Sequence, residues 1–176
     1  FNYRVLRPWV RDPAFYQTIW MYESDVPAHE GPTNHSLLEF WQYDFPLKKQ
    51  DAQKMAYELE VIPKLLFQAR GNLTGNARDL WVAGIENFKD QEKNILYIRE
   101  KIWGEHGKKF DKFLKKPIEK ALKANKEFLD WLISKEPSKN GPSGIGKENY
   151  SWYQQNVHLV PLSWEEEVSL LKRELD

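Results

Sequence analysis

The chain has 176 residues, 41% of them hydrophobic and 30% charged, as expected for one folded domain with its own core. The formal charge is zero, so no overall field favours nucleic acid or an anionic membrane, and no apolar run reaches the roughly 20 residues of a membrane span. The absence of cysteine excludes disulfides, thiolate metal sites and cysteine nucleophiles.

Residues 1–48 are rich in proline and aromatic side chains, which predicts short helices separated by breaks. Asp12-Pro13 is a helix start, because proline fits the first helical turn, and the helix is expected over residues 14–22. A second short helix is expected from Ser36 to about Tyr43. Aromatic residues make up 14% of the chain, so they must fill a core or line a groove.

Residues 50–134 show the clearest pattern, with apolar side chains at intervals of three and four. Long helices are expected from about residue 50 to 73, from 78 to 103 and from 110 to 132. Pro63 and Pro117 fall inside the first and the third, where a missing N–H predicts a kink or a break. The sequence predicts an all-α fold, an irregular multi-helix bundle in one domain over residues 1–176, with two or three long antiparallel helices.

The C-terminal part reads as a loop over residues 135–147 and a helix–Pro–helix unit over 148–176, broken at Pro161. Ser163 and Glu166 match the capping box, in which each side chain accepts a hydrogen bond from a backbone N–H of the first turn.

Motifs for catalysis or metal binding are absent from the sequence. The four histidines, at positions 29, 35, 106 and 158, are scattered and form no H-E-x-x-H zinc helix. His106, at a helix end, is interpreted as a partner of the helix dipole or a solvated residue. Neither a G-x-S-x-G elbow nor a phosphate-binding P-loop is present. The lysine-rich face of residues 108–126 lies opposite the apolar stripe and indicates a solvated surface, so no nucleic-acid partner is expected.

Three segments in order resemble a known family: "LRPWVRDPAFYQTI", "YELEVIPKLLFQARGNL" and "GIGKENYSWYQQNVHLVPLSWEEEVSLLKREL". Together they are similar to the bacterial "domain of unknown function 885" proteins over nearly the whole chain. The last segment is the most specific, with Gly146, then Tyr150, and then the turn into the final helix.

The resemblance implies a mostly helical, zincin-like hydrolase, a metallopeptidase whose zinc helix lies C-terminal to the last segment. This chain would then be the N-terminal helical portion, with no catalytic or metal-binding residue of its own and with zinc in the full-length protein. Its expected partners are the C-terminal catalytic half of the same protein and a peptide-like substrate. Where family members carry an apolar or His-Thr-Thr-like run, this chain has Asn156-Val157-His158.

Within the chain, the expected wall of the substrate cleft consists of Tyr150, Tyr153 and His158, with Gly144 and Gly146 allowing close backbone approach. The alternative for the two tyrosines is a helical stripe that packs into the core. The chain begins at Phe1, as a mature product or an excerpt would, and a periplasmic, secreted or lipoprotein location is expected over the cytoplasm.

Two other functions stay open on the sequence. A non-catalytic helical module would bind a peptide or a glycan by stacking on the N-terminal aromatic clusters, of which Trp20 and Trp41 are members. A scaffold domain would instead hold a catalytic half or a partner subunit, and it predicts an exposed apolar patch.

Overall fold

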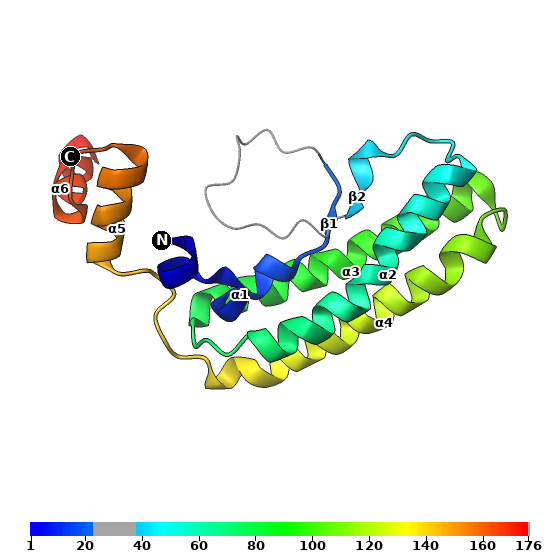
Figure 1. Ribbon diagram of the computed structural model, residues 1–176, viewed down its shortest axis with the longest axis horizontal. Helices are drawn as coiled ribbons and strands as arrows, with labels where there is room; N and C mark the ends of the chain where they lie inside the picture. Colours follow the sequence, from blue (N-terminus) through cyan, green and yellow to red (C-terminus); the bar gives the residue numbers. More distant parts are fainter. Residues whose placement is uncertain (23–37, 176) are drawn as a thin grey trace.

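The computed structural model describes residues 1–22 and 38–175, and three long helices dominate it (Figure 1). They are α2 (Lys49–Asn72), α3 (Arg78–His106) and α4 (Asp111–Lys135). Short connections make successive helices antiparallel, and α4 packs against both α2 and α3. The predicted all-α bundle with long helices is therefore confirmed.

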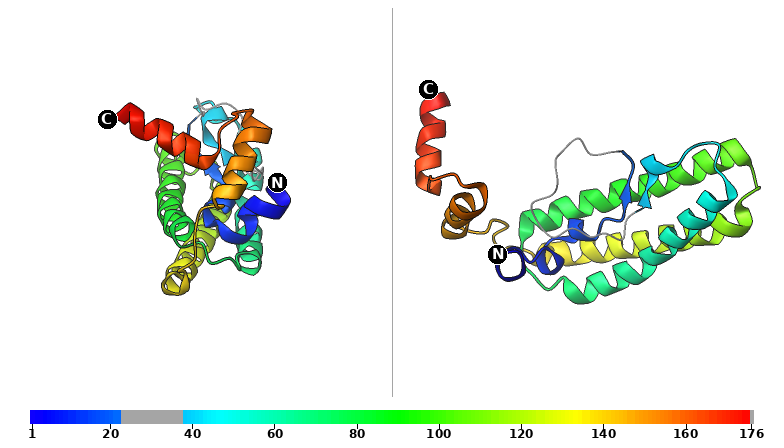
Figure 2. Two further views of the ribbon diagram at one scale, coloured as in Figure 1. Left: turned by 90° about the vertical axis from the view of Figure 1, so that its left-hand side faces the viewer. Right: turned by 45° about the horizontal axis from the view of Figure 1, so that its top comes forward.

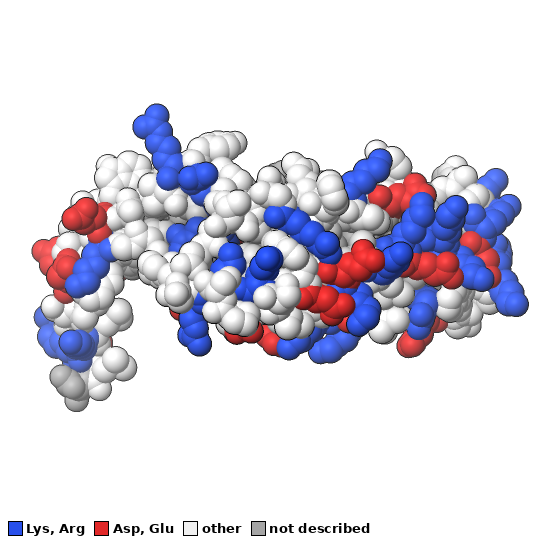
Figure 3. All heavy atoms as spheres, turned by 90° about the horizontal axis from the view of Figure 1, so that it is seen from below, with Lys and Arg blue, Asp and Glu red and all other residues white. Residues whose placement is uncertain are grey.

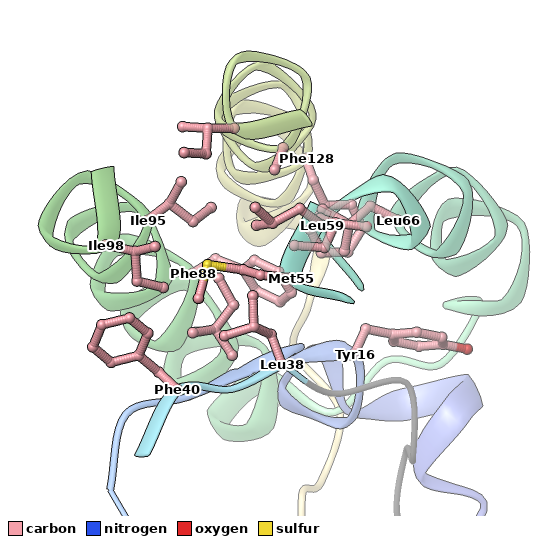
Figure 4. Packing of buried hydrophobic residues seen from close by; sticks show 14 of the residues in the cluster. Tyr16, Leu38, Phe40, Met55, Leu59, Leu66, Phe88, Ile95, Ile98 and Phe128 are labelled. Atoms are coloured by element: carbon pink, nitrogen blue, oxygen red, sulfur yellow. The ribbon is translucent and has the colours of Figure 1, made fainter. Parts of the chain in front are cut away.

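Each long helix buries one apolar stripe, which explains why these segments are helical. Most of the core is made of these stripes: Ala52, Met55, Leu59, Ile62, Leu66 and Ala69 in α2; Trp81, Ile85, Phe88, Ile95, Ile98 and Ile102 in α3; Leu114, Ile118, Ala121, Phe128, Leu129 and Leu132 in α4. Figure 4 shows side chains from the helices and from the N-terminal segment meeting between them. Complete burial of such a side chain contributes about 1.5–3 kcal/mol.

The predicted helix boundaries shift only at the ends. α2 and α4 continue without a break through Pro63 and Pro117, and a kink at either proline stays a prediction. α3 continues three residues beyond the expected Trp103, and Gly107 follows it with φ 54°, a left-handed conformation that favours glycine.

An irregular N-terminal segment begins at the end of the bundle near α5 and then covers the side between α2 and α3 (Figure 1). It comprises the π-helix η1 (Asn2–Leu6), α1 (Pro8–Arg11), the 3₁₀-helix η2 (Pro13–Tyr16) and β1 (Ile19–Trp20). η2 contacts both long helices, and β1 contacts α3 (Figure 4). This segment takes the place that a fourth helix would fill in a regular bundle.

The helix predicted over residues 14–22 is wrong beyond Tyr16. Its start is as expected, because the Asp12 carboxylate accepts a hydrogen bond from the Ala14 N–H at 2.9 Å. The chain then becomes extended at Gln17, and the Thr18 N–H donates to the side-chain oxygen Oε1 of Gln91 at 2.7 Å. A contact with α3 thus replaces the next helical hydrogen bond.

The helix predicted from Ser36 to Tyr43 is also wrong in its described part. Its first two residues lie outside the described residues, as do His29 and His35. β2 (Leu38–Glu39) pairs in parallel with β1, and the 3₁₀-helix η3 (Phe40–Gln42) follows. Strands of two residues are too short to show the alternation from which a strand is predicted.

The N-terminal aromatic side chains belong largely to the core. Tyr16, Phe40 and Tyr43 are buried, and Phe15 and Phe45 pack against the core. The Tyr43 hydroxyl donates to the carboxylate of Glu58 at 2.5 Å. Exposed aromatics do remain in this region, with Tyr22 exposed by 83% and Trp41 by 41%.

After α4, the chain leaves the bundle. It passes through the 3₁₀-helix η4 (Glu136–Ser138) into α5 (Lys147–Tyr153), the π-helix η5 (Gln154–His158) and α6 (Trp164–Leu175). None of the residues described in α5, η5 and α6 is buried. Figure 2 shows α5 and α6 projecting from one end of the bundle, beyond the ends of the long helices.

Charged side chains of both signs are interspersed over the face shown in Figure 3. On α4, Lys123 and Lys126 lie 3.8 and 4.0 Å from carboxylates one turn further along the helix, those of Glu127 and Asp130. The lysine-rich face is solvated, and the expected absence of a nucleic-acid partner stays a prediction. Among the helices of the described residues, none has both the length and the apolar character needed to cross a membrane.

Candidate functional site

Gly146, one of the expected wall residues, immediately precedes α5, and its backbone conformation lets the helix begin at Lys147. Gly146 has φ 84° and ψ 155°, a conformation that L side chains rarely adopt, and its carbonyl accepts the hydrogen bond from the Tyr150 N–H at 3.0 Å. Asn149 adds a second local bond, donating from Nδ2 to the Ile145 carbonyl at 2.8 Å. A side chain at Gly144 would by contrast meet open space, so this glycine is not required by any close approach.

α5 and α6 are held together by polar contacts. The Tyr150 hydroxyl donates to Oε2 of Glu167 at 2.6 Å, and this hydrogen bond is the main cause that raises the pKa of Tyr150. The Trp164 N–H donates to the Ser151 hydroxyl at 2.9 Å. The Lys147 ammonium lies 3.9 Å from the centre of the Trp164 ring. The two helices therefore form one unit, the α5–α6 unit.

The capping box predicted for α6 is confirmed. The Ser163 N–H donates to Oε2 of Glu166 at 2.7 Å, and the Glu166 N–H donates to the Ser163 hydroxyl at 3.3 Å. The hydrogen bond from the Ser163 N–H to the ionised carboxylate is the main cause that lowers the pKa of Glu166, and the Ser163 hydroxyl adds to it.

Tyr153 and His158 lie together, with ring centres 5.1 Å apart in an edge-to-face arrangement. The Phe1 ring packs beside them. Its centre lies 4.8 Å from that of Tyr153 and 5.3 Å from that of Trp152, on which it is stacked. Tyr150 is directed instead to α6. None of the three expected wall residues is buried, so the tyrosines do not form a stripe of the bundle core.

The loop that leads to α5 is fixed to the bundle by Arg11. Its Nη2 donates to the carbonyl oxygens of Pro142, Ser143 and Gly144, at 3.1, 2.5 and 3.3 Å. The Ser143 hydroxyl in turn accepts hydrogen bonds from the Asp79 and Leu80 N–H groups, at 2.7 and 3.3 Å. A serine from a distant loop therefore caps the first turn of α3.

Gly141 allows the same loop to approach α3 closely. Its N–H donates to the Asn76 carbonyl at 2.8 Å, and a Cβ atom at position 141 would lie only 2.5 Å from that oxygen. Arg11, Ser143 and Gly141 could not be recognised from the sequence, because their partners lie far away along the chain. The spacing of Arg4, Arg7 and Arg11, three and then four residues apart, was the signal available locally.

The described residues do not fit a zinc site. They contain no group of three or more His, Asp or Glu side chains placed to hold a metal ion. Nε2 of His106 accepts a hydrogen bond from the Leu47 N–H at 2.8 Å, and its ring packs edge-to-face against Phe110. His106 is thus half-buried and binds a backbone N–H, so it is not the solvated residue of the two alternatives. It is the last residue of α3, and its interaction with the helix dipole stays a prediction.

Comparison with protein-family models, with curated proteins and with solved structures returns no match for this chain.

Proposed function

We propose that this chain is the helical portion of a zinc-dependent peptidase or amidase and that it forms one wall of the substrate cleft. The observation that carries the proposal is the position of the family-like segment 144–158. It lies at one end of the bundle, contains no buried residue in α5 or η5, and is tied to the bundle by the Arg11 hydrogen bonds. A segment held in place yet left outside the core is suited to contact a ligand.

Tyr153 and His158 are the residues proposed to meet the substrate. Their rings are adjacent and neither is buried, so an aromatic surface and an imidazole are presented together. Tyr150 has a different proposed role, because its hydroxyl is already bound to Glu167. It orients the α5–α6 unit. Gly146 lets the chain turn into α5, as its positive φ requires.

Zinc, in this proposal, is bound by the C-terminal catalytic half of the same protein. The residues described here do not fit it, and no step of hydrolysis is assigned to them. The role proposed for this chain is to bind and orient a peptide-like substrate beside the metal.

The test is peptide hydrolysis by the polypeptide encoded by the complete gene, measured before and after treatment with a chelator. We expect activity to disappear with the metal and to return with added zinc. His158→Ala should lower kcat/KM about tenfold or more. The control is Tyr57→Phe in α2, where the tyrosine is 74% exposed, and it should leave kcat/KM unchanged. Hydrolysis that survives complete metal removal would contradict the zinc mechanism, and an unchanged kcat/KM for His158→Ala would contradict the cleft wall.

A scaffold function is the second candidate, favoured by the apolar side chains of the α5–α6 unit. Leu159, Leu171 and Leu175 are exposed by 79%, 60% and 86%. Such a surface is usual where another polypeptide docks. The glycan- or peptide-stacking module has less support, because the N-terminal aromatics that suggested it are largely in the core.

A further inference from the structure

A hollow of about 440 Å³ lies where the N-terminal segment meets the two loops at the start of α3 and before α5. We call it the arginine pocket, because Arg4, Arg7 and Arg11 all line it. The facing wall comes from Asn76, Gly141 and their neighbours. None of its lining residues is an aspartate or a glutamate, so three positive charges face one space without a counter-charge in its wall.

Arg4 and Arg7 are exposed and have no partner for their charge among the described residues. Neither side chain makes a hydrogen bond, an ion pair or a cation–π contact with any described residue. Elsewhere, exposed lysines pair with carboxylates one turn away, as Lys89 does with Glu86 at 2.7 Å and Lys93 with Asp90 at 2.7 Å. The donors of these two guanidinium groups are therefore open to solvent and to a ligand.

Arg11 is held in a fixed position at the same pocket. Its Nη2 atom donates to the loop carbonyls of residues 142–144, while Nε and Nη1 make no hydrogen bond with any described residue. The Asp12 carboxylate lies near enough for Arg11 to lower its pKa. A guanidinium group anchored by one edge presents its other donors in a defined direction. Such a group loses little side-chain entropy when it binds an anion.

The wall opposite is rigid because backbone approaches backbone there. The Gly75 N–H donates to the Val10 carbonyl at 2.8 Å, and a Cβ atom at Gly75 would lie 2.9 Å from the Cα of Arg11. Arg7 itself adopts a left-handed conformation, φ 41° and ψ 54°, at the junction of η1 and α1. The positive end of the α3 dipole lies beside the pocket as well, since Ala77 lines it and α3 begins at the next residue.

We propose that the arginine pocket binds a small oxyanion, the phosphate or carboxylate group of a ligand. Guanidinium groups match these anions in geometry and form charge-assisted hydrogen bonds with them. Although the Asp12 carboxylate lies near Arg11, no acidic residue stands in the pocket wall. Converging positive charges there raise the local concentration of anions. The proposal does not depend on the proposed peptidase function, because it uses only residues of this chain.

The test is titration of this chain at low ionic strength with inorganic phosphate and, separately, with an N-acetylated dipeptide that has a free C-terminal carboxylate. The dipeptide amide is the uncharged control, and isothermal calorimetry or NMR shifts of the Arg4, Arg7 and Arg11 side chains report binding. We expect at least one of the two anions to bind with a Kd of about a millimolar or lower, and to bind more weakly as salt is added. The better ligand identifies the source of the oxyanion.

The variant Arg4→Gln/Arg7→Gln should weaken this binding at least tenfold. Both side chains are exposed and make no hydrogen bond or ion pair with a described residue, so the fold should be retained, which an unchanged Tm checks. Lys115→Gln/Lys116→Gln removes the same charge from an exposed part of α4 and should change the Kd less than twofold. The proposal is overturned if neither anion binds, or if the arginine and lysine variants bind equally well.

Discussion

Gln91 donates a hydrogen bond from Nε2 to Oδ1 of Asn125 across 2.9 Å in the interior of the bundle, where both side chains are fully buried. Oε1 of Gln91 accepts from the N–H and the hydroxyl of Thr18, at 2.7 and 3.1 Å. Nδ2 of Asn125 donates to the Phe88 carbonyl at 3.0 Å. These two amides therefore join the N-terminal segment, α3 and α4 through one buried polar network.

Asn125→Ala should destabilise the protein by about 2–4 kcal/mol, because it leaves the Gln91 donor unpaired and opens a cavity. Unfolding in denaturant measures this change in the free energy of unfolding. Asn87→Ala, at an α3 residue with no hydrogen bond from its side chain, should cost less than about 0.5 kcal/mol. Replacing Gln91 and Asn125 together by Leu should cost less than the sum of the single replacements, and full additivity would speak against a coupled network.

Gly84 lies where α3 passes Pro13, and a Cβ atom there would be 2.5 Å from the Cβ of that proline. Gly84→Ala should therefore cost about 1–3 kcal/mol through overpacking. Gly104 belongs to the same helix and has no neighbour within 4 Å, so Gly104→Ala should stabilise by up to about 1 kcal/mol. Thermal unfolding of the two variants compares them directly, and a stabilised Gly84→Ala would disprove the close packing of η2 on α3.

Ser143→Ala removes the side chain that caps α3 from a distant loop. We expect a loss of about 1 kcal/mol, because the N–H groups of Asp79 and Leu80 lose their acceptor. Ser138→Ala is the matched control, since that exposed hydroxyl donates only to the Lys135 carbonyl of its own turn. Equal effects of the two replacements, measured by urea unfolding, would rule out the capping role.

The stability of the folded protein depends on pH through the carboxyl group of Asp12. Burial raises the pKa of its carboxyl group, and this effect exceeds the lowering by the Ala14 N–H and by Arg11. The folded state therefore binds the proton at a higher pH than the unfolded chain does. The contribution of Asp12 to stability falls as the pH rises from the unfolded pKa, 3.8, through the raised folded value, and stays at its lower level at neutral pH.

Asp12→Asn keeps the cap on Ala14 without a buried charge, so its stability at pH 7 should equal or exceed that of the natural chain. Asp12→Ala should lose about 1 kcal/mol, because the cap is gone. Unfolding measured from pH 3 to pH 7 should show a smaller change for Asp12→Asn than for the natural chain. If the free energy of unfolding changed with pH in the same way for both proteins, Asp12 would not be the cause of this pH dependence.

The three long helices were predictable because their apolar side chains recur at a local period, and the structure changes only their ends. The conformation of the segment around Thr18 could not be predicted, because it depends on a hydrogen bond to Gln91, 73 residues away. For the candidate wall, the spacing of Tyr150 and Tyr153 predicts a stripe but does not say what the stripe faces. Arg11 gave no local sign of its partners, because those are carbonyl groups more than 130 residues further along the chain.

The hydrogen bonds from Arg11 span 131 to 133 residues, whereas the three long helices all lie between residues 49 and 135 and are joined by short loops. Closing so long a loop is entropically costly until the helices are in place, so these bonds should form after the rate-limiting step of folding. Arg11→Met should then accelerate unfolding and leave the refolding rate unchanged, as stopped-flow measurements in urea can show. Slower refolding of this variant would mean instead that the two ends of the chain meet early.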